Sequence, residues 1–286
     1  MQFGEIRCAH QDGSPPLTLK TGSPPGESGV SVLRMRFQRG AHFSATTRQH
    51  LIFFQLSPHL RLDCRMAGQS LCHETRTGAL AICPAGIDCS AETDASADML
   101  LIAIKPGQLA LAAAEDSAIE AQLNERLSGY DAELMRLARA LAAENAGGYP
   151  NGPLFWNEAS GRFMCRLLFG HASMPENLSR GSLGRRALLR IRDHILAHLG
   201  EPIEVAELAK LAGRSPFHFS RVFARSVGMT PHRYVVHLRL QAAIEQVRQG
   251  HAGLAEIAAD TGFADQSHLS RWIRRVHGVA PSEFCA

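Results

Sequence analysis

Two short stretches near the C-terminal end of the chain carry the same set of side chains that could bind an acidic polymer. Residues 217–221 read FHFSR, and residues 267–271 read SHLSR. In both stretches an arginine directly follows a serine. An arginine guanidinium can bind the edge of guanine through two hydrogen bonds, and a serine hydroxyl makes a short, permissive contact in the major groove. The repeated phrase therefore predicts contacts to DNA bases.

The phrase belongs to a longer internal duplication. Residues 205–231 and 254–281 share the pattern AE[LI]AxxxG, which is followed after four or five residues by H[FL]SRxxxRxxGxxP. Glycine tolerates the left-handed backbone that commonly ends a helix. Each copy is therefore predicted to be a short helix, a turn at the glycine and a second helix.

The second helix of each copy has a start signal and an apolar stripe. Ser215 offers an N-cap hydroxyl before Pro216, which suits the first helical position, and Asp265 is the equivalent cap in the second copy. The residues expected to face the core are Phe219, Val222 and Phe223 in the first copy, and Leu269, Trp272, Ile273 and Val276 in the second. The opposite faces then point the serines and arginines outward.

The segment between the copies is predicted to form one long helix. Residues 231–249 would extend roughly 28 Å at about 1.5 Å per residue. Successive major grooves on one side of B-DNA lie about 34 Å apart, so one chain could place two recognition helices in adjacent grooves. The alternative is a plain helical bundle with solvated arginines, which the outward arginines and the charge balance oppose. Residues 185–286 contain 14 Lys and Arg against nine Asp and Glu, whereas residues 1–184 contain 16 against 18.

The C-terminal third resembles a known DNA-binding domain. Residues 186–286 are similar to that of AraC/XylS-family transcription regulators, which has two helix–turn–helix motifs joined by a long helix. The stretch GFADQSHLSRWIRRVHGVAPSEF (262–284) resembles the pattern typical of that family, and LAKLAGRSPFHFSRVFARSVGMTPHRYVVHLRLQAA (208–243) matches its first half. The resemblance implies a sequence-specific, effector-responsive regulator of transcription. We expect an activator, although the sequence does not itself separate activation from repression.

Individual roles follow from the resemblance, position by position. Base-edge contacts are implied for Phe217, Ser220, Arg221, Ser267, His268 and Arg271. Phosphate contacts, which position the protein without reading sequence, are implied for Arg225, Arg274 and Arg275. Two alternatives stay open. Phe217 could pack in the core, and His268 could brace a helix or touch a phosphate.

The N-terminal part is predicted to be a β-rich domain followed by a helix pair. Alternating apolar and polar residues predict strands at 31–37, 50–57, 60–64, 79–83 and 99–104, which favours a small β-barrel or jelly roll. Helical periodicity appears at 133–144 and 157–170, and this pair could cap the barrel or form a dimer surface. Residues 12–29, rich in Pro, Gly and Ser, are expected to be a flexible lead-in.

The expected organisation is therefore an α+β protein of two domains. By the resemblance, residues 1–170 form a cupin-like β-barrel with a helix pair that senses an effector and dimerises. Residues 171–185 are the expected linker, and residues 186–286 the all-α double helix–turn–helix domain. The expected partners are double-stranded DNA, an unidentified small-molecule effector and a second copy of the chain, with RNA polymerase as a further candidate.

The sequence contains only weak signals for redox, metal or enzyme chemistry. Cys64, Cys72, Cys83 and Cys89 fall within 26 residues and could form a thiol or soft-metal sensor, but Cys64 and Cys83 lie on apolar strand faces, which favours burial. Residues 1–184 contain no His-x-His pair, and Cys72-His73 lacks the Pro-Cys-His-Arg motif of alkylation repair. We therefore expect no metal, no cofactor and no enzyme activity. No apolar run is long enough to span a membrane, so a cytoplasmic protein is expected.

Overall fold

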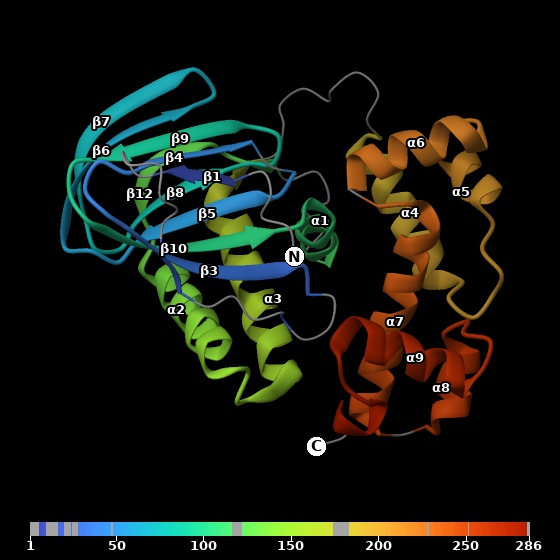
Figure 1. The fold of residues 1–286 in the computed structure, drawn as a ribbon. Coiled ribbons are helices and arrows are strands. Elements are labelled where there is room, and N and C mark those ends of the chain that lie inside the picture. Colours follow the sequence, from blue (N-terminus) through green and yellow to red (C-terminus); the bar gives the residue numbers. More distant parts are fainter. Residues whose placement is uncertain are drawn as a thin grey trace. The chain divides into compact units, whose positions relative to one another are not determined.

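A computed structural model describes residues 6–9, 17–19, 24, 28–46, 48–115, 122–173, 183–227, 229–250 and 252–284. The chain divides into two compact units (Figure 1). The first comprises Met1–Leu109 and Gln122–Ser173, and the second Ala110–Ala121 and Met174–Ala286. The first unit is rich in strands and the second is helical, in agreement with the predicted α+β class.

The first unit contains two antiparallel sheets. One has the order β1 (Ile6–Ala9), β4 (His42–Thr46), β9 (Asp88–Thr93), β6 (His59–Met66) and β7 (Gln69–Arg76). The other has the order β12 (Arg126–Tyr130), β8 (Ala79–Cys83), β5 (His50–Gln55), β10 (Ala97–Ile104), β3 (Val30–Phe37) and β2 (Leu17–Leu19). A short separate pair joins β11 (Gln122–Leu123) to β13 (Ala172–Ser173).

The predicted β-rich domain is confirmed, but the strands that the structure describes do not form a closed barrel. Among the described strands no ladder joins one sheet to the other, so the two remain open. The physical reason is visible at β7, which ends the five-stranded sheet and is exposed along most of its length, so it brings little apolar surface to a further pairing. The expected lead-in at 12–29 also needs correction, because β2 lies within it and pairs with β3.

Strand β10 explains the uninterrupted apolar run MLLIAI at residues 99–104. Leu101 and Ala103 face the core between the two sheets, and Leu100 and Ile102 are buried on the opposite face. Helices α2 (Ala132–Gly147) and α3 (Gly152–His171) lie against the six-stranded sheet in Figure 1. The contact is direct, since the rings of Phe54 on β5 and Phe163 on α3 lie 6.3 Å apart. A strand covered on both faces needs apolar residues at successive positions.

The helix pair is confirmed and slightly longer than predicted. Asp131 caps α2 by accepting a hydrogen bond from the Leu134 amide at 2.9 Å. The same buried carboxylate binds Arg166 at 2.8 Å and His171 at 3.0 Å, both on α3. Burial alone would raise the pKa of Asp131, but these hydrogen bonds outweigh it and lower the pKa. His171 and the two residues of β13 thus belong to the first unit, although the sequence placed them in the linker.

The second unit consists of helices. Helix α1 (Pro106–Glu115) falls at the division between units, and α4 (Arg185–Ala197) precedes the duplicated region. The first copy forms α5 (Val205–Leu211) and α6 (Pro216–Val227), and the second α8 (Leu254–Asp260) and α9 (Gln266–His277), followed by a 3₁₀ turn at Pro281–Phe284. The two predicted helix–turn–helix motifs are confirmed, with Gly213 and Gly262 at positive φ of 63° and 74°.

The predicted connecting helix is also confirmed. Helix α7 runs unbroken over Pro231–Gln249, with Thr230 as N-cap and Gly250 in the left-handed conformation at its end. In Figure 1 one motif lies at each end of α7. The rings of Phe219 and Phe223 pack 5.3 Å apart, and Phe223 packs on Tyr234 of α7 at 5.4 Å, so the first motif is fixed to this helix. Within the described ranges no helix is both long and apolar enough to cross a membrane.

Candidate functional site

Helix α6 presents the outward face that the sequence predicts. Phe219, Val222 and Phe223 are buried, whereas Phe217 is 76% exposed. The alternative that Phe217 packs in the core is therefore wrong. The Arg221 guanidinium lies 5.9 Å from the Phe217 ring centroid, close enough for a cation–π contact. The Ser220 hydroxyl donates to the Pro216 carbonyl at 3.0 Å.

Helix α9 presents a similar face in the second motif. Asp265 caps the helix by accepting from the His268 amide at 2.7 Å, as predicted. Ser267 and Arg271, four residues apart and so on one face of the helix, are both exposed. The residues expected to serve phosphates, Arg225 on α6 and Arg274 and Arg275 on α9, are exposed as well.

The predicted apolar stripe of α9 needs one correction. Leu269 and Ile273 are fully buried, but Trp272 and Val276 are half-buried. Two polar neighbours contact the half-buried Trp272 indole. It donates a hydrogen bond to Nε2 of His268 at 3.0 Å, and the Arg275 guanidinium lies 5.2 Å from its ring centroid.

The ring of His268 is occupied within the protein. Besides the bond from Trp272, its Nδ1 lies 3.4 Å from the Ala264 amide, and its edge meets the Phe263 ring at 5.6 Å between centroids. A neutral imidazole accepts at one nitrogen, so the shorter contact from Trp272 defines its role. This geometry favours the bracing role that the sequence left open for His268.

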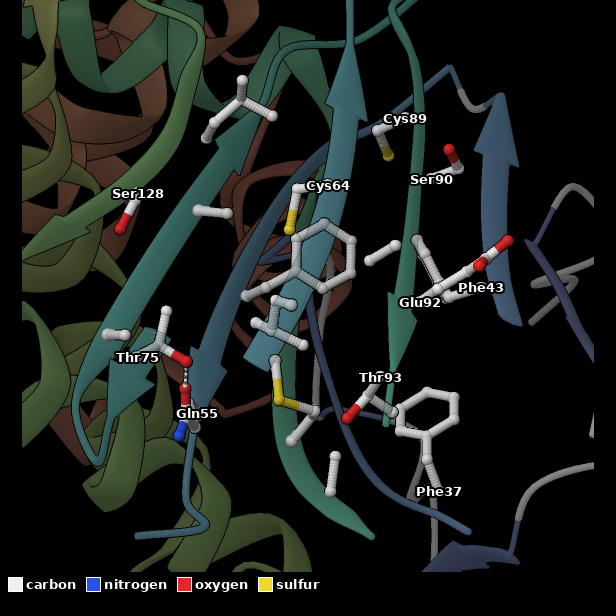
Figure 2. A pocket seen from close by; sticks show the side chains of 18 of the residues that line it. Phe37, Phe43, Gln55, Cys64, Thr75, Cys89, Ser90, Glu92, Thr93 and Ser128 are labelled. Carbon is white, nitrogen blue, oxygen red and sulfur yellow. Dashed lines mark hydrogen bonds between the residues drawn. The ribbon is translucent and has the colours of Figure 1, made fainter. Parts of the chain in front are cut away.

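The first unit contains a cavity between its two sheets (Figure 2). Its volume is about 90 Å³, and its walls are mainly apolar, including Phe37, Phe43 and Met99. The Gln55 and Thr75 side chains hydrogen-bond to each other at one end. Thr75 also donates to the Leu60 carbonyl, and Gln55 donates to the Ser57 carbonyl at 3.0 Å. Because these two polar groups are satisfied internally and the walls are mainly apolar, the cavity favours a small, mainly apolar molecule.

The structure does not gather the four cysteines. Cys83 and Cys89 are buried, and the Cys83 thiol donates to the Ile87 carbonyl at 3.3 Å. The interaction between the two thiols raises the pKa of Cys83 and lowers that of Cys89. Burial raises the pKa of the Cys64 thiol to about 11. Cys72 is exposed on β7. A four-cysteine sensor is therefore unsupported. Among the residues that the structure describes, no group of three or more His, Cys, Asp or Glu side chains could hold a metal ion.

Sequence reasoning missed two features of these sites. The cavity was missed because its lining comes from strands far apart in the chain, and its one signal is the polar Gln55 at the end of the apolar strand HLIFFQ. The second is Arg239 on α7, whose guanidinium donates to two backbone carbonyls. Its signal is a charge placed between the buried residues Leu238 and Leu240.

Comparison with known proteins agrees with the geometry. A family model described as a helix-turn-helix domain matches residues 208–286, which defines this part of the chain as a DNA-binding module. The chain is 33% identical over 100 residues to the probable transcriptional regulator LumQ of Photobacterium leiognathi, covering 35% of this chain and 40% of LumQ. It is 36% identical over 80 residues to a putative AraC-like transcription regulator of Streptomyces lividans, covering 28% of this chain and 26% of the relative.

Residues 208–286 therefore match a helix-turn-helix domain, and this part of the chain resembles AraC-like transcription regulators, as the repeated motif indicated. The chain aligns with less than half the length of these two relatives. A solved structure of ToxT from Vibrio cholerae aligns with 90% of this chain and 97% of its own, at 14% identity and a TM-score of 0.38.

Proposed function

We propose that the protein is a sequence-specific regulator of transcription that places α6 and α9 in adjacent major grooves of DNA. The observation that carries the proposal is the paired outward display of arginine and serine on two helices joined by α7. Arg221 and Arg271 would bind guanine edges, with Ser220 and Ser267 beside them and Phe217 against a thymine methyl group. Arg225, Arg274 and Arg275 would bind phosphates.

The test is selection of bound sequences from a random DNA pool with the full-length protein at fixed, moderate salt. Two enriched blocks about 10 bp apart are the expected result, since that spacing is one turn of B-DNA. A single block would contradict the two-groove arrangement and leave one motif to position the domain on phosphates. Absence of any enriched motif, with and without the apolar probes described next, would contradict sequence-specific binding.

The cavity between the two sheets supports a second part of the proposed function, which is the binding of an effector. We propose that it binds a small apolar effector that changes DNA affinity. Its volume of about 90 Å³ is smaller than the dry apolar cavity of about 150 Å³ that is known to take up benzene, so the effector should be no larger than benzene. Full-length protein should therefore be stabilised against heat by small apolar probes no larger than benzene. Ala91→Phe, which fills the cavity, should remove the shift, and Ser70→Phe on the exposed strand β7 should keep it.

The proposal also includes a homodimer that reads two such sites in direct or inverted repeat, with RNA polymerase as a further partner. Sedimentation of the full-length protein with and without the selected DNA tests the dimer. A complex containing one chain per two-block site, at every protein concentration, would contradict it.

A further inference from the structure

A single arginine connects the second helix–turn–helix motif to the loop that precedes the first. Arg239 lies in the middle of α7, and its Nη1 donates to the Gly262 carbonyl at 2.8 Å. Its Nη2 donates to the Glu201 carbonyl at 2.6 Å. Gly262 lies in the turn between α8 and α9, whereas Glu201 lies in the loop between α4 and α5. One guanidinium thus joins the backbones of both halves of the domain.

The backbones are also in close contact around this arginine. A Cβ atom on Gly262 would lie 2.2 Å from the Leu199 carbonyl oxygen and 2.6 Å from Cζ of Arg239. A Cβ atom on Gly200 would lie 3.0 Å from the Asp260 carbonyl oxygen. No side chain separates the two segments at these points, so a small shift of one half would collide with the other.

The chemistry of the contact requires arginine. The guanidinium is half-buried, and this burial lowers the pKa of Arg239. Carbonyl oxygens in the last turn of a helix and just beyond it carry partial negative charge, so the Gly262 carbonyl after α8 is a favourable acceptor. A planar guanidinium holds two acceptors in fixed directions, whereas a lysine ammonium is a single point charge on a flexible stem.

We propose that Arg239 is a positioning residue that sets the orientation of α9 relative to α6, and thereby the spacing between the two DNA blocks that the protein accepts. The inference rests on the proposed two-groove function. One added or removed base pair moves a block by about 3.4 Å along the DNA and rotates it by about a tenth of a turn. A domain fixed at Arg239 would reject such a change, and a domain released there would tolerate it.

The experiment measures the affinity of the full-length protein for three DNAs, in which the two selected blocks are at their selected spacing or one base pair closer or further apart. For wild type we expect each altered spacing to weaken binding roughly tenfold, the loss of part of one block's contacts. For Arg239→Gln we expect the difference among the three DNAs to fall below about threefold. Affinity for a DNA with one block should stay unchanged in the variant, because Arg239 itself touches no base in this proposal.

A matched control lies on the same helix. Arg248 is exposed, and its guanidinium lies 5.6 Å from the Phe284 ring centroid rather than at the contacts of Arg239. Arg248→Gln should therefore keep the wild-type spacing dependence. Circular dichroism reports whether each variant folds. If Arg239→Gln does not fold, Arg239→Lys decides, because it keeps the charge and stem but cannot hold both carbonyls.

The outcomes distinguish the proposed role of Arg239 from the proposed two-groove binding. A folded Arg239 variant with the wild-type spacing dependence would overturn the inference and leave two-groove binding intact. A wild-type protein that binds one block as well as two would overturn two-groove binding itself. Equal weakening on all three DNAs by Arg239→Gln would mean that the arginine supports affinity without setting spacing, which also overturns the inference.

Discussion

The two helix–turn–helix motifs share a framework but differ on the surface that would meet DNA. Each has a glycine turn at positive φ and a buried pair on its second helix, Phe219 with Phe223 and Leu269 with Ile273. On α6 the aromatic Phe217 is exposed beside Arg221, whereas on α9 the aromatic Trp272 is half-buried and holds His268. The duplication preserved packing while the outward faces diverged. The two motifs should therefore prefer different base sequences.

The turns differ as well. The space around Gly213 is open, while Gly262 abuts Leu199 and Arg239. The first turn needs glycine for its backbone conformation alone, and the second also needs the absence of a side chain. The second motif is thus the more constrained of the two, although their sequences look alike.

The largest effect on stability is expected from substitutions at the two glycine turns. Gly213→Ala should cost about 1–2 kcal/mol of unfolding free energy, the price of a left-handed conformation for a residue with a Cβ atom. Gly262→Ala should cost roughly 3 kcal/mol or more, because overpacking against the Leu199 carbonyl is added. Urea unfolding of both variants measures the difference. Equal losses would show that the junction relaxes around the added methyl group.

The next effect concerns the two groove-facing arginines. Arg221→Ala and Arg271→Ala should each weaken binding by roughly 1–3 kcal/mol and relax preference in one block only. Competition binding with DNAs altered in one block or the other measures this. If both variants relaxed the same block, the assignment of one motif to each block would fail.

A smaller effect on stability is expected from a substitution that tests the role of His268. Because its ring accepts from Trp272, His268→Ala should lower stability by about 1 kcal/mol. Base preference in the second block should be preserved if His268 braces α9. Thermal unfolding together with repeated sequence selection checks both parts. A lost preference at one position would instead restore His268 as a base reader.

The smallest expected effect is electrostatic. Arg275→Gln should weaken binding similarly for all sequences and reduce the slope of log K against log salt by about 1, since one phosphate contact is lost. Arg225→Gln should do the same from α6. Titrations at several salt concentrations measure the slope. A change in sequence preference would show that either residue contacts a base.

Much of the helical unit was predictable because its signals are local. The capping residues Asp265 and Gly250 and the repeated apolar positions lie within a few residues of the elements that they define. The strands β4 and β9 were missed because they contain small residues, such as Ala45 on β4 and the cavity-lining Cys89 and Ala91 on β9, which leaves little hydrophobic alternation. Strand β7 was missed because it is mostly exposed. Arg239 joins carbonyls far away in the chain, which no local pattern reveals.

Strand β10, buried on both faces, also has a consequence for how the protein is made. Its partners β3 and β5 are both synthesised earlier, so the centre of the six-stranded sheet cannot close until residues 97–104 have left the ribosome. Until then the apolar residues of β3 and β5 have no partner strand between them, and unpaired apolar strands promote aggregation. The helical unit depends on contacts closer in sequence, which form quickly. At high expression levels we therefore expect inclusion bodies to arise from the strand-rich unit, and fusion of a solubilising domain before it to help more than one placed after it.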